Sequence, residues 1–487
     1  MILYWSFGLC LGRSGKGVFC FMPKDEKKIQ LFESTPIPNA ILTLAVPTVL
    51  SSLVMVIYNL ADTYFVSILG DPLQSAAVTL AAPVLLAFNA INNLFGVGGS
   101  SMMSRAMGRG DYDTVSRSSA FSFYASVFSG LLFSLLCTVF AAPLLTLLGA
   151  DASTAAATEA YMYWTVTWGA APAILNVVMA QLVRAEGSSL HASIGTMSGC
   201  FLNIILDPIF ILPWGLNMGA AGAGLATFLS NCVACIYFFI LLFVRRGKTF
   251  VCINPRMFSF KRSVVLGVLG VGLPASIQNL LNVTGMTILN NFTASFGADA
   301  VAAMGITKKV DMVPMNVAMG LSQGIMPLVS YNYSSGNIKR CRDTITMAAK
   351  GTLIFLSAIA LGYYFGAAGV VGLFMKNESI VAYGTKFLRA MCIGLPFLSM
   401  DFMAVGVFQA VGMGKEALFF AITRKLLLEI PLLYLLNWLM PLYGLPLAQT
   451  ISEVVMATMA VIFLVRLFKR LERDFTHPKY QTESPTE

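Results

Sequence analysis

A carboxylate and an amide one helical turn apart, inside an apolar stretch, are the residues best placed to do chemistry in this chain. Asp207 lies in the run from Cys200 to Pro213, and Asn203 precedes it by four residues. In a helix, residues at this spacing share a face, so both oxygen-bearing side chains point to the same place. Pro208 has no N–H, which predicts a kink there and a freed backbone carbonyl.

Placing an ionisable residue inside a membrane span costs roughly 2.5–3.5 kcal/mol of insertion free energy. Such a residue is therefore interpreted first as functional. We interpret Asp207 as part of a site for a proton or a small cation. The alternative is a carboxylate that caps the end of a neighbouring helix.

A second acid in an early apolar span extends this site. Asp62 follows Asn59 by three residues, again one helical turn. The predicted coupling-cation site combines Asp62, Asn203 and Asp207 with the hydroxyl of Thr227. Two carboxylates in one dry site do not both stay ionised unless a cation joins them, which is the physical basis for coupling to H⁺ or Na⁺.

Other polar residues within apolar spans are predicted to line a substrate pathway. Gln278 and Asn282 lie one turn apart, with simple interhelical hydrogen bonding as the alternative. Asp311 follows Lys308 by three residues, so a helix ion pair competes with a role in the pathway. Asp401 is expected to face substrate or proton, and Asn59 completes the predicted pathway.

Two glutamates have a different expected role. Glu429 lies near Arg424 and Lys425 and just before Pro431, which favours a structural ion pair. Glu453 is expected to face the second-half counterpart of the cation site.

The composition indicates a polytopic, all-α integral membrane protein. The 487 residues are 57% hydrophobic and 11% charged, with a mean hydropathy of +0.76. Soluble domains carry about 25% charged residues. The net charge of +9 comes with no nucleic-acid-binding pattern, so the expected partners are the lipid bilayer and small molecules. Nine scattered cysteines and two separated histidines predict no metal site. With no catalytic triad, P-loop or dinucleotide-binding loop, we expect no enzymatic activity and no cofactor beyond a coupling ion.

Twelve hydrophobic spans follow a polar leader, each long enough to cross a bilayer, for which about 20 residues suffice. They are predicted at 40–68, 77–104, 119–148, 160–183, 192–214, 220–244, 263–296, 300–330, 344–374, 383–411, 418–441 and 444–468. The predicted divisions are a leader at 1–39, a first lobe at 40–246, a linker at 247–262, a second lobe at 263–468 and a tail at 469–487.

The two lobes are predicted to be pseudo-symmetric six-helix units. Val46-Pro47 in the first span matches Leu273-Pro274 in the seventh. The stretch 169–187 in the first half matches 394–412 in the second, with prolines and closing glycines in the same order. Because six is an even number, both halves enter from the same side and form parallel repeats about an axis along the membrane normal.

The distribution of basic residues predicts the orientation. Alternate loops and the two terminal segments hold 26 of the 32 lysines and arginines. Positive residues stay on the cytoplasmic side, so both termini are expected there. Residues 1–21 fit neither a membrane span nor a signal peptide, and we interpret them as a tail from an upstream start codon that packs on nothing.

Several motifs, in order, resemble the multidrug and toxic compound extrusion (MATE) family, in the bacterial branch that includes MepA-type exporters. They are YNLADTYFVSILG (58–70), VGGSSMMSRAMGRGD (97–111), RAEGSSLHA (184–192), NIILDPIFI (203–211), GAAGAGLATFLS (219–230), PLVSYNYSSGN (327–337) and FQAVGMGKEA (408–417). The resemblance covers residues 30 to 470. It implies a twelve-helix efflux antiporter that exports organic cations or other drugs in exchange for Na⁺ or H⁺.

The resemblance also implies site residues. In related members the first-lobe site uses residues that fall on Asp62, Asn203, Asp207 and Thr227 here. Some members carry an acid near the position of Asp401, together with one on the seventh span that this chain lacks. We expect a monomer in a bacterial inner (cytoplasmic) membrane.

The runner-up function is a lipid-linked oligosaccharide flippase of the same superfamily. A flippase would hold a pyrophosphate in a cleft lined with arginines. Only Arg389 is expected within a span, which favours the antiporter.

Overall fold

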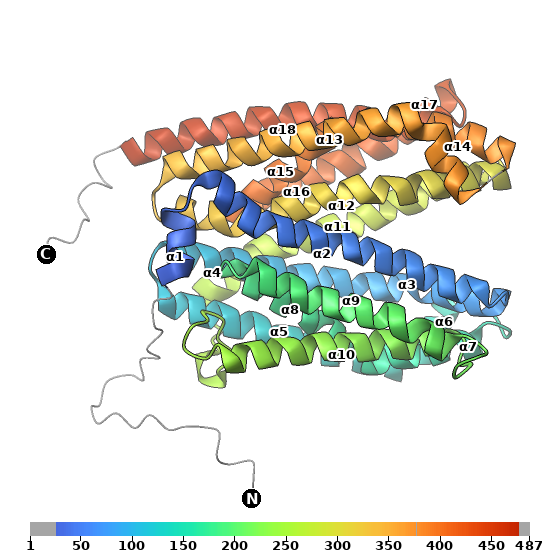
Figure 1. The fold of residues 1–487 in the computed structure, drawn as a ribbon, viewed down its shortest axis with the longest axis horizontal. Helices are drawn as coiled ribbons and strands as arrows, with labels where there is room; N and C mark the ends of the chain where they lie inside the picture. The colour runs from blue at the N-terminus through green and yellow to red at the C-terminus, as the bar shows by residue number, and fades with distance from the viewer. Residues whose placement is uncertain (1–25, 376, 477–487) are drawn as a thin grey trace, which may run out of the picture.

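The protein is described here from a computed structural model that covers residues 26–375 and 377–476; the proposed tail at 1–21 lies outside these residues. Every regular element in the described part is a helix (Figure 1). The first half consists of α1 (Glu26–Glu33), α2 (Ile37–Ile68), α3 (Pro72–Asn92), η1 (Asn93–Val97), α4 (Gly98–Gly108), α5 (Tyr112–Val139), α6 (Ala141–Leu147), α7 (Ala155–Met162), η2 (Tyr163–Trp168), α8 (Ala170–Ala185), α9 (Ser189–Ile211) and α10 (Ala220–Val244).

The second half begins after a connection that contains the short helix η3 (Pro255–Met257). It consists of α11 (Arg262–Ala294), α12 (Ala298–Ser334), α13 (Ile338–Phe374), α14 (Glu378–Cys392), α15 (Leu395–Val411), α16 (Gly414–Ile422), η4 (Thr423–Glu429), α17 (Ile430–Leu439) and α18 (Gly444–Thr476). Figure 1 shows the helices of the two halves as neighbouring groups with roughly parallel axes.

Each of the twelve predicted spans coincides with helical structure. Among the described residues, nine helices are long and apolar enough to cross a membrane, and two further pairs qualify when each is taken as one span bent by 49°. The bent pairs are α7–η2 with α8, and α14 with α15. The predicted span 418–441 coincides with α16, η4 and α17, which follow one another without a break and are not among the eleven that qualify.

The expectation that Arg389 alone lies within a span needs correction. Arg184 lies in α8, and Arg424 and Lys425 lie in η4. Arg184 and Arg424 are each only 6% exposed, so Arg389 is not the only arginine within the bundle. Helix α9 continues through Pro208 to Ile211, so the residue at which a kink is predicted lies inside the helix.

The two halves meet along a seam of small residues. A side chain on Gly324 of α12 would meet the Cα of Ala45 of α2 at 2.6 Å, and one on Gly320 would meet Val49 at 3.0 Å. Gly98 faces the backbone of Val268 and Gly272 of α11 in the same way. Small residues let helix backbones approach closely, which is how helices associate in a membrane.

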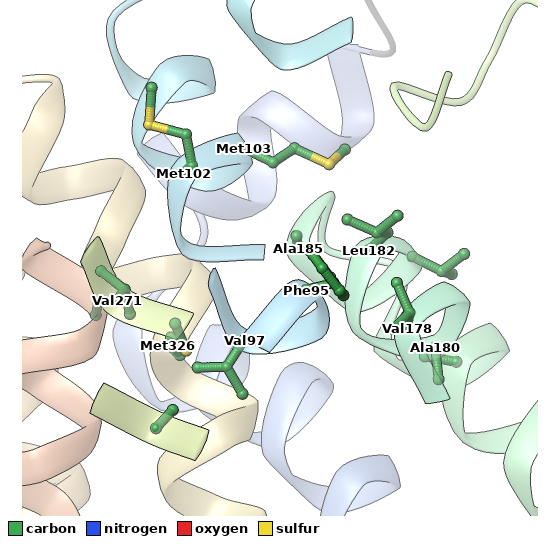
Figure 2. Packing of buried hydrophobic residues seen from close by; sticks show 14 of the residues in the cluster. Phe95, Val97, Met102, Met103, Val178, Ala180, Leu182, Ala185, Val271 and Met326 are labelled. Atoms are coloured by element: carbon green, nitrogen blue, oxygen red, sulfur yellow. The ribbon is translucent and has the colours of Figure 1, made fainter. Parts of the chain in front are cut away.

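Side chains from both halves form one continuous buried cluster around this seam. Val97 and Val178 come from the first half, and Val271 and Met326 come from the second (Figure 2). The hydrogen bonds between the halves lie in the same region: Ser276 donates to the Ala90 carbonyl at 2.5 Å, and Ser101 donates to the Gln409 carbonyl at 2.5 Å.

Helix α1 connects the two halves at the end of the bundle where α18 also ends (Figure 1). On the first-half side, Lys28 pairs with Glu186 at 2.7 Å. On the second-half side, Tyr331 donates to Glu33 at 2.6 Å and Arg340 donates to the Phe32 carbonyl at 2.7 Å. These contacts hold the two halves together at this end of the molecule.

The seam predicts a packing defect in Gly324→Val. Because the added atoms meet the α2 backbone, we expect a loss of roughly 1–3 kcal/mol of folded-state stability, typical of overpacking. Thermal unfolding of the purified protein measures it. Gly351→Val is the matched control, since a side chain there meets nothing within 4 Å. Equal melting temperatures for the two variants would contradict the close packing of α2 on α12.

Candidate coupling-ion site and central cleft

The first half buries a carboxylate, an amide and a hydroxyl together. Asp207 is 0% exposed and Asn203 is 1% exposed, both on the inner face of α9. With the amide turned to satisfy both of its ends, its nitrogen donates to Asp207 Oδ2 at 2.8 Å and its oxygen accepts from the Thr227 backbone N–H at 3.1 Å. The predicted i, i+4 pair therefore meets in space and also reaches α10.

Asp62 reaches the same place from α2. Its carboxylate interacts electrostatically with that of Asp207. Its Oδ1 atom is buried and accepts no hydrogen bond from the described residues. A buried carboxylate oxygen without a donor is costly, so it is suited to accept a proton or to coordinate a cation.

Two tyrosines that sequence reasoning missed complete this environment. The hydroxyl of Tyr58 lies close to the side chain of Thr227 and to both acids. Tyr161 interacts with the same two carboxylates and is 3% exposed. Tyr58 precedes Asp62 by one helical turn, a spacing that could have revealed it. Tyr161 is distant in sequence and carries no such signal.

A separate cleft of about 320 Å³ lies between the halves. Its wall is rich in amides and hydroxyls, with some apolar side chains such as Met55 and Phe402. The polar lining consists of Ser51, Ser52, Asn89, Asn92, Asn93, Gln181, Arg184, Thr196, Gln278, Asn279, Asn282, Asn316, Ser322, Gln323 and Gln409.

The predicted pathway residues divide between this cleft and other places. Gln278 and Asn282 line the cleft, and Gln278 also accepts a hydrogen bond from Gln409 at 3.4 Å. Asn59 is exposed on α2 and is not among the lining residues. Asp311 accepts from Gln449 at 3.2 Å, and Gln449 in turn accepts from Lys308, so the direct ion pair with Lys308 does not form.

Asp401 belongs to a buried charge network in the second half. Arg424 lies between two acids, donating to Asp401 at 3.1 Å and to Glu453 at 2.7 Å. All three side chains are at least 92% buried. Lys425 pairs with Glu429 at 2.6 Å, which confirms the structural pair predicted for Glu429.

The first-half site and the charge network of the second half therefore differ in the partners of their acids. In the network a guanidinium and an ammonium neutralise Asp401, Glu453 and Glu429. At the first-half site the partners are an amide, a hydroxyl and phenols. Among the described residues no group of three or more histidines, cysteines or acids could hold a metal ion.

Comparison with known proteins identifies the family. The MatE family model matches residues 47–209 and 274–435, one segment in each half. The chain belongs to the MatE family. Multidrug export protein MepA of Staphylococcus aureus (strain MRSA252) is 32% identical over 453 residues, which cover 93% of this chain and 98% of MepA.

Solved MATE structures agree with the fold. A MATE transporter in complex with MaL6 superposes with a TM-score of 0.87 at 27% identity, covering 92% of this chain and 99% of that one. A multidrug-resistance MATE family transporter in an outward-facing conformation gives 0.86 at 26% identity, with the same coverage. The fold predicted from the sequence is thereby confirmed, and the chain belongs to a family of membrane-spanning multidrug efflux transporters.

The charge network of the second half predicts a stability effect for Arg424→Met. Removing the guanidinium leaves Asp401 and Glu453 buried without a counter-charge, which costs roughly 3–5 kcal/mol. We expect a clearly lower melting temperature for the purified variant. Arg389→Met, at an exposed arginine that donates to the Tyr364 carbonyl, is the control.

A triple variant tests the cause. Adding Asp401→Asn and Glu453→Gln to Arg424→Met removes the uncompensated charge and should restore much of the lost stability. An Arg424→Met protein as stable as the parent would contradict the network's structural role.

Proposed function

We propose that this MATE protein is a secondary active multidrug efflux antiporter that exports drugs or organic cations in exchange for H⁺ or Na⁺. The observation that supports this most is a pair of acids, the buried Asp207 and the partly buried Asp62, whose Oδ1 is buried; neither has a cationic partner among the described residues. Such a pair gains most from a proton or Na⁺. We assign Asp62, Asn203, Asp207 and Thr227 to that coupling site.

Helix α2 offers a physical link between the ion and the drug. It carries Asp62 toward one end and packs Ala45 and Val49 against α12 nearer the other. Leaving two like charges in a dry site costs several kcal/mol. A ligand must favour one state by about 5.5 kcal/mol to move a two-state equilibrium from 1:99 to 99:1. Ion binding at Asp62 therefore has the right magnitude to bias how the halves pack.

The direction of transport follows from where the halves touch. The hydrogen bonds between the halves lie beside the cleft or toward the end that carries α1 and the end of α18. We propose that this end is cytoplasmic, that both termini lie there, and that the described state is open outward, in a bacterial cytoplasmic membrane. Ion binding to Asp62 and Asp207 then favours drug release, and the unloaded carboxylates favour drug entry from inside.

The cleft does not favour the flippase. A pyrophosphate carries several negative charges and needs several basic partners. Among the described residues, Arg184 is the one basic side chain in the cleft wall.

The deciding experiment is ethidium efflux from proteoliposomes, driven separately by a Na⁺ gradient and by a pH gradient. Transport under one gradient, lost in both Asp62→Asn and Asp207→Asn, is the expected result, because neither variant can hold the cation in the same way. Which gradient drives it identifies the ion.

Asp113→Asn is the matched control, since Asp113 is half exposed and pairs with Arg117 in α5. It should transport like the parent. Transport that survives in both Asp62→Asn and Asp207→Asn would refute the assigned site. An inactive parent under either gradient would refute ethidium antiport.

A further inference from the structure

The central cleft has an unusual balance of polar groups for a site that takes cations. Ten of its lining side chains are asparagines or glutamines, four from the first half and six from the second. The lining contains no aspartate or glutamate among the described residues, and Asp62 and Asp207 lie outside it. Amides carry no net charge and can turn to present either a donor or an acceptor. The net charge of the cleft lining is therefore determined by Arg184.

Arg184 faces this cleft as a buried cation without a counter-charge. Its side chain is 6% exposed and lies in the last turn of α8. Its guanidinium donates to Gln181 Oε1 at 2.9 Å, and its Nε atom is buried with no acceptor among the described residues. It forms no ion pair within the described part of the chain.

The nearest acid in sequence is already engaged. Glu186 pairs with Lys28 at 2.7 Å and accepts from the Phe250 backbone N–H at 2.6 Å. A buried charge that keeps no counter-ion is expensive, and an oxyanion would satisfy it with charge-assisted hydrogen bonds. Two further buried atoms in the cleft wall, Asn92 Oδ1 and Asn279 Oδ1, have no donor from the described residues.

We propose that the central cleft binds solutes that carry a carboxylate together with hydrogen-bond donors, and that Arg184 is the specificity-determining residue that contacts the carboxylate. The amides around it contact the donors and the neutral parts of the solute. A planar zwitterion fits this arrangement, and a simple organic cation leaves Arg184 unpaired. This inference rests on the proposed efflux function and narrows its substrate class.

A pair of dyes that differ only at the carboxylate tests the inference. Rhodamine 110 has a free carboxylate, and rhodamine 123 is its methyl ester with the same xanthene rings. Binding of each dye to the purified full-length chain is measured by fluorescence polarisation. A charge-assisted hydrogen bond contributes about 1.5–3 kcal/mol, so we expect rhodamine 110 to bind about tenfold more tightly, or more.

Variants at Arg184 assign the preference to this side chain. Arg184→Gln should weaken rhodamine 110 binding about tenfold and change rhodamine 123 binding by less than about twofold. Arg184→Lys should retain part of the preference, since it keeps the charge and loses the planar fork. Arg389→Gln, at an exposed arginine outside the cleft lining, should bind both dyes like the parent.

The outcomes separate the inference from the function on which it rests. Equal affinity of the parent for the two dyes, or tighter binding of rhodamine 123, overturns the inference whether or not any variant folds. Equal losses for both dyes in Arg184→Gln assign Arg184 a structural role and also overturn it. Ethidium transport alongside either result leaves the antiporter intact. The predicted dye preference without gradient-driven transport of any dye supports the carboxylate site and refutes the antiporter.

Discussion

Charge buried away from water must be compensated, and this constraint organises the whole molecule. Around Arg424 and Lys425, the acids Asp401, Glu453 and Glu429 are compensated permanently, because both cations are part of the chain. At the first-half site the compensation is incomplete, since Asp62 and Asp207 form no ion pair among the described residues. A network that already holds its counter-ions is suited to rigidity, and one that lacks a cation is suited to respond to one.

The seam between the halves is where cation binding can change how the two halves pack. Its glycines bring α2 and α12 to backbone contact, so the seam has few side chains that could adjust to a small displacement. Closely packed interfaces tend to switch between discrete arrangements because they do not deform continuously. Helix α2 takes part in both the acid pair and the seam, which places the ion and the interface on one rigid element.

Buried polar groups in the cleft also need partners, although an unpaired amide costs less than an unpaired charge. Amide side chains satisfy one another when nothing is bound, as Gln181 does with Gln323 at 3.3 Å across the two halves. Exchanging such neutral hydrogen bonds for those of a solute costs little. A fixed charge such as that of Arg184 is not neutralised by hydrogen bonds to amides. It therefore makes the cleft select among solutes that the amide side chains alone would accept equally.

The sequence alone determined the elements and the main pair of residues. Apolar runs of this length can only be membrane helices, and the i, i+4 spacing placed Asn203 and Asp207 on one face whatever packed around them. The sequence also predicted that Asp62 joins this pair. Other partners distant in sequence were decided only by the tertiary structure, because the approach of Tyr161 and the network around Arg424 depend on which helices pack together.

Two arginines show why the local sequence pattern does not predict which charged residues are buried. Basic residues near the ends of apolar runs usually reach water, and Arg389 was therefore the one arginine expected within a span, without Arg184 and Arg424. Their burial depends on helices that continue beyond the apolar pattern and on acids and amides contributed by other helices. Periodicity along one segment carries no information about those neighbours, because compensation of a buried charge is a property of the packed bundle.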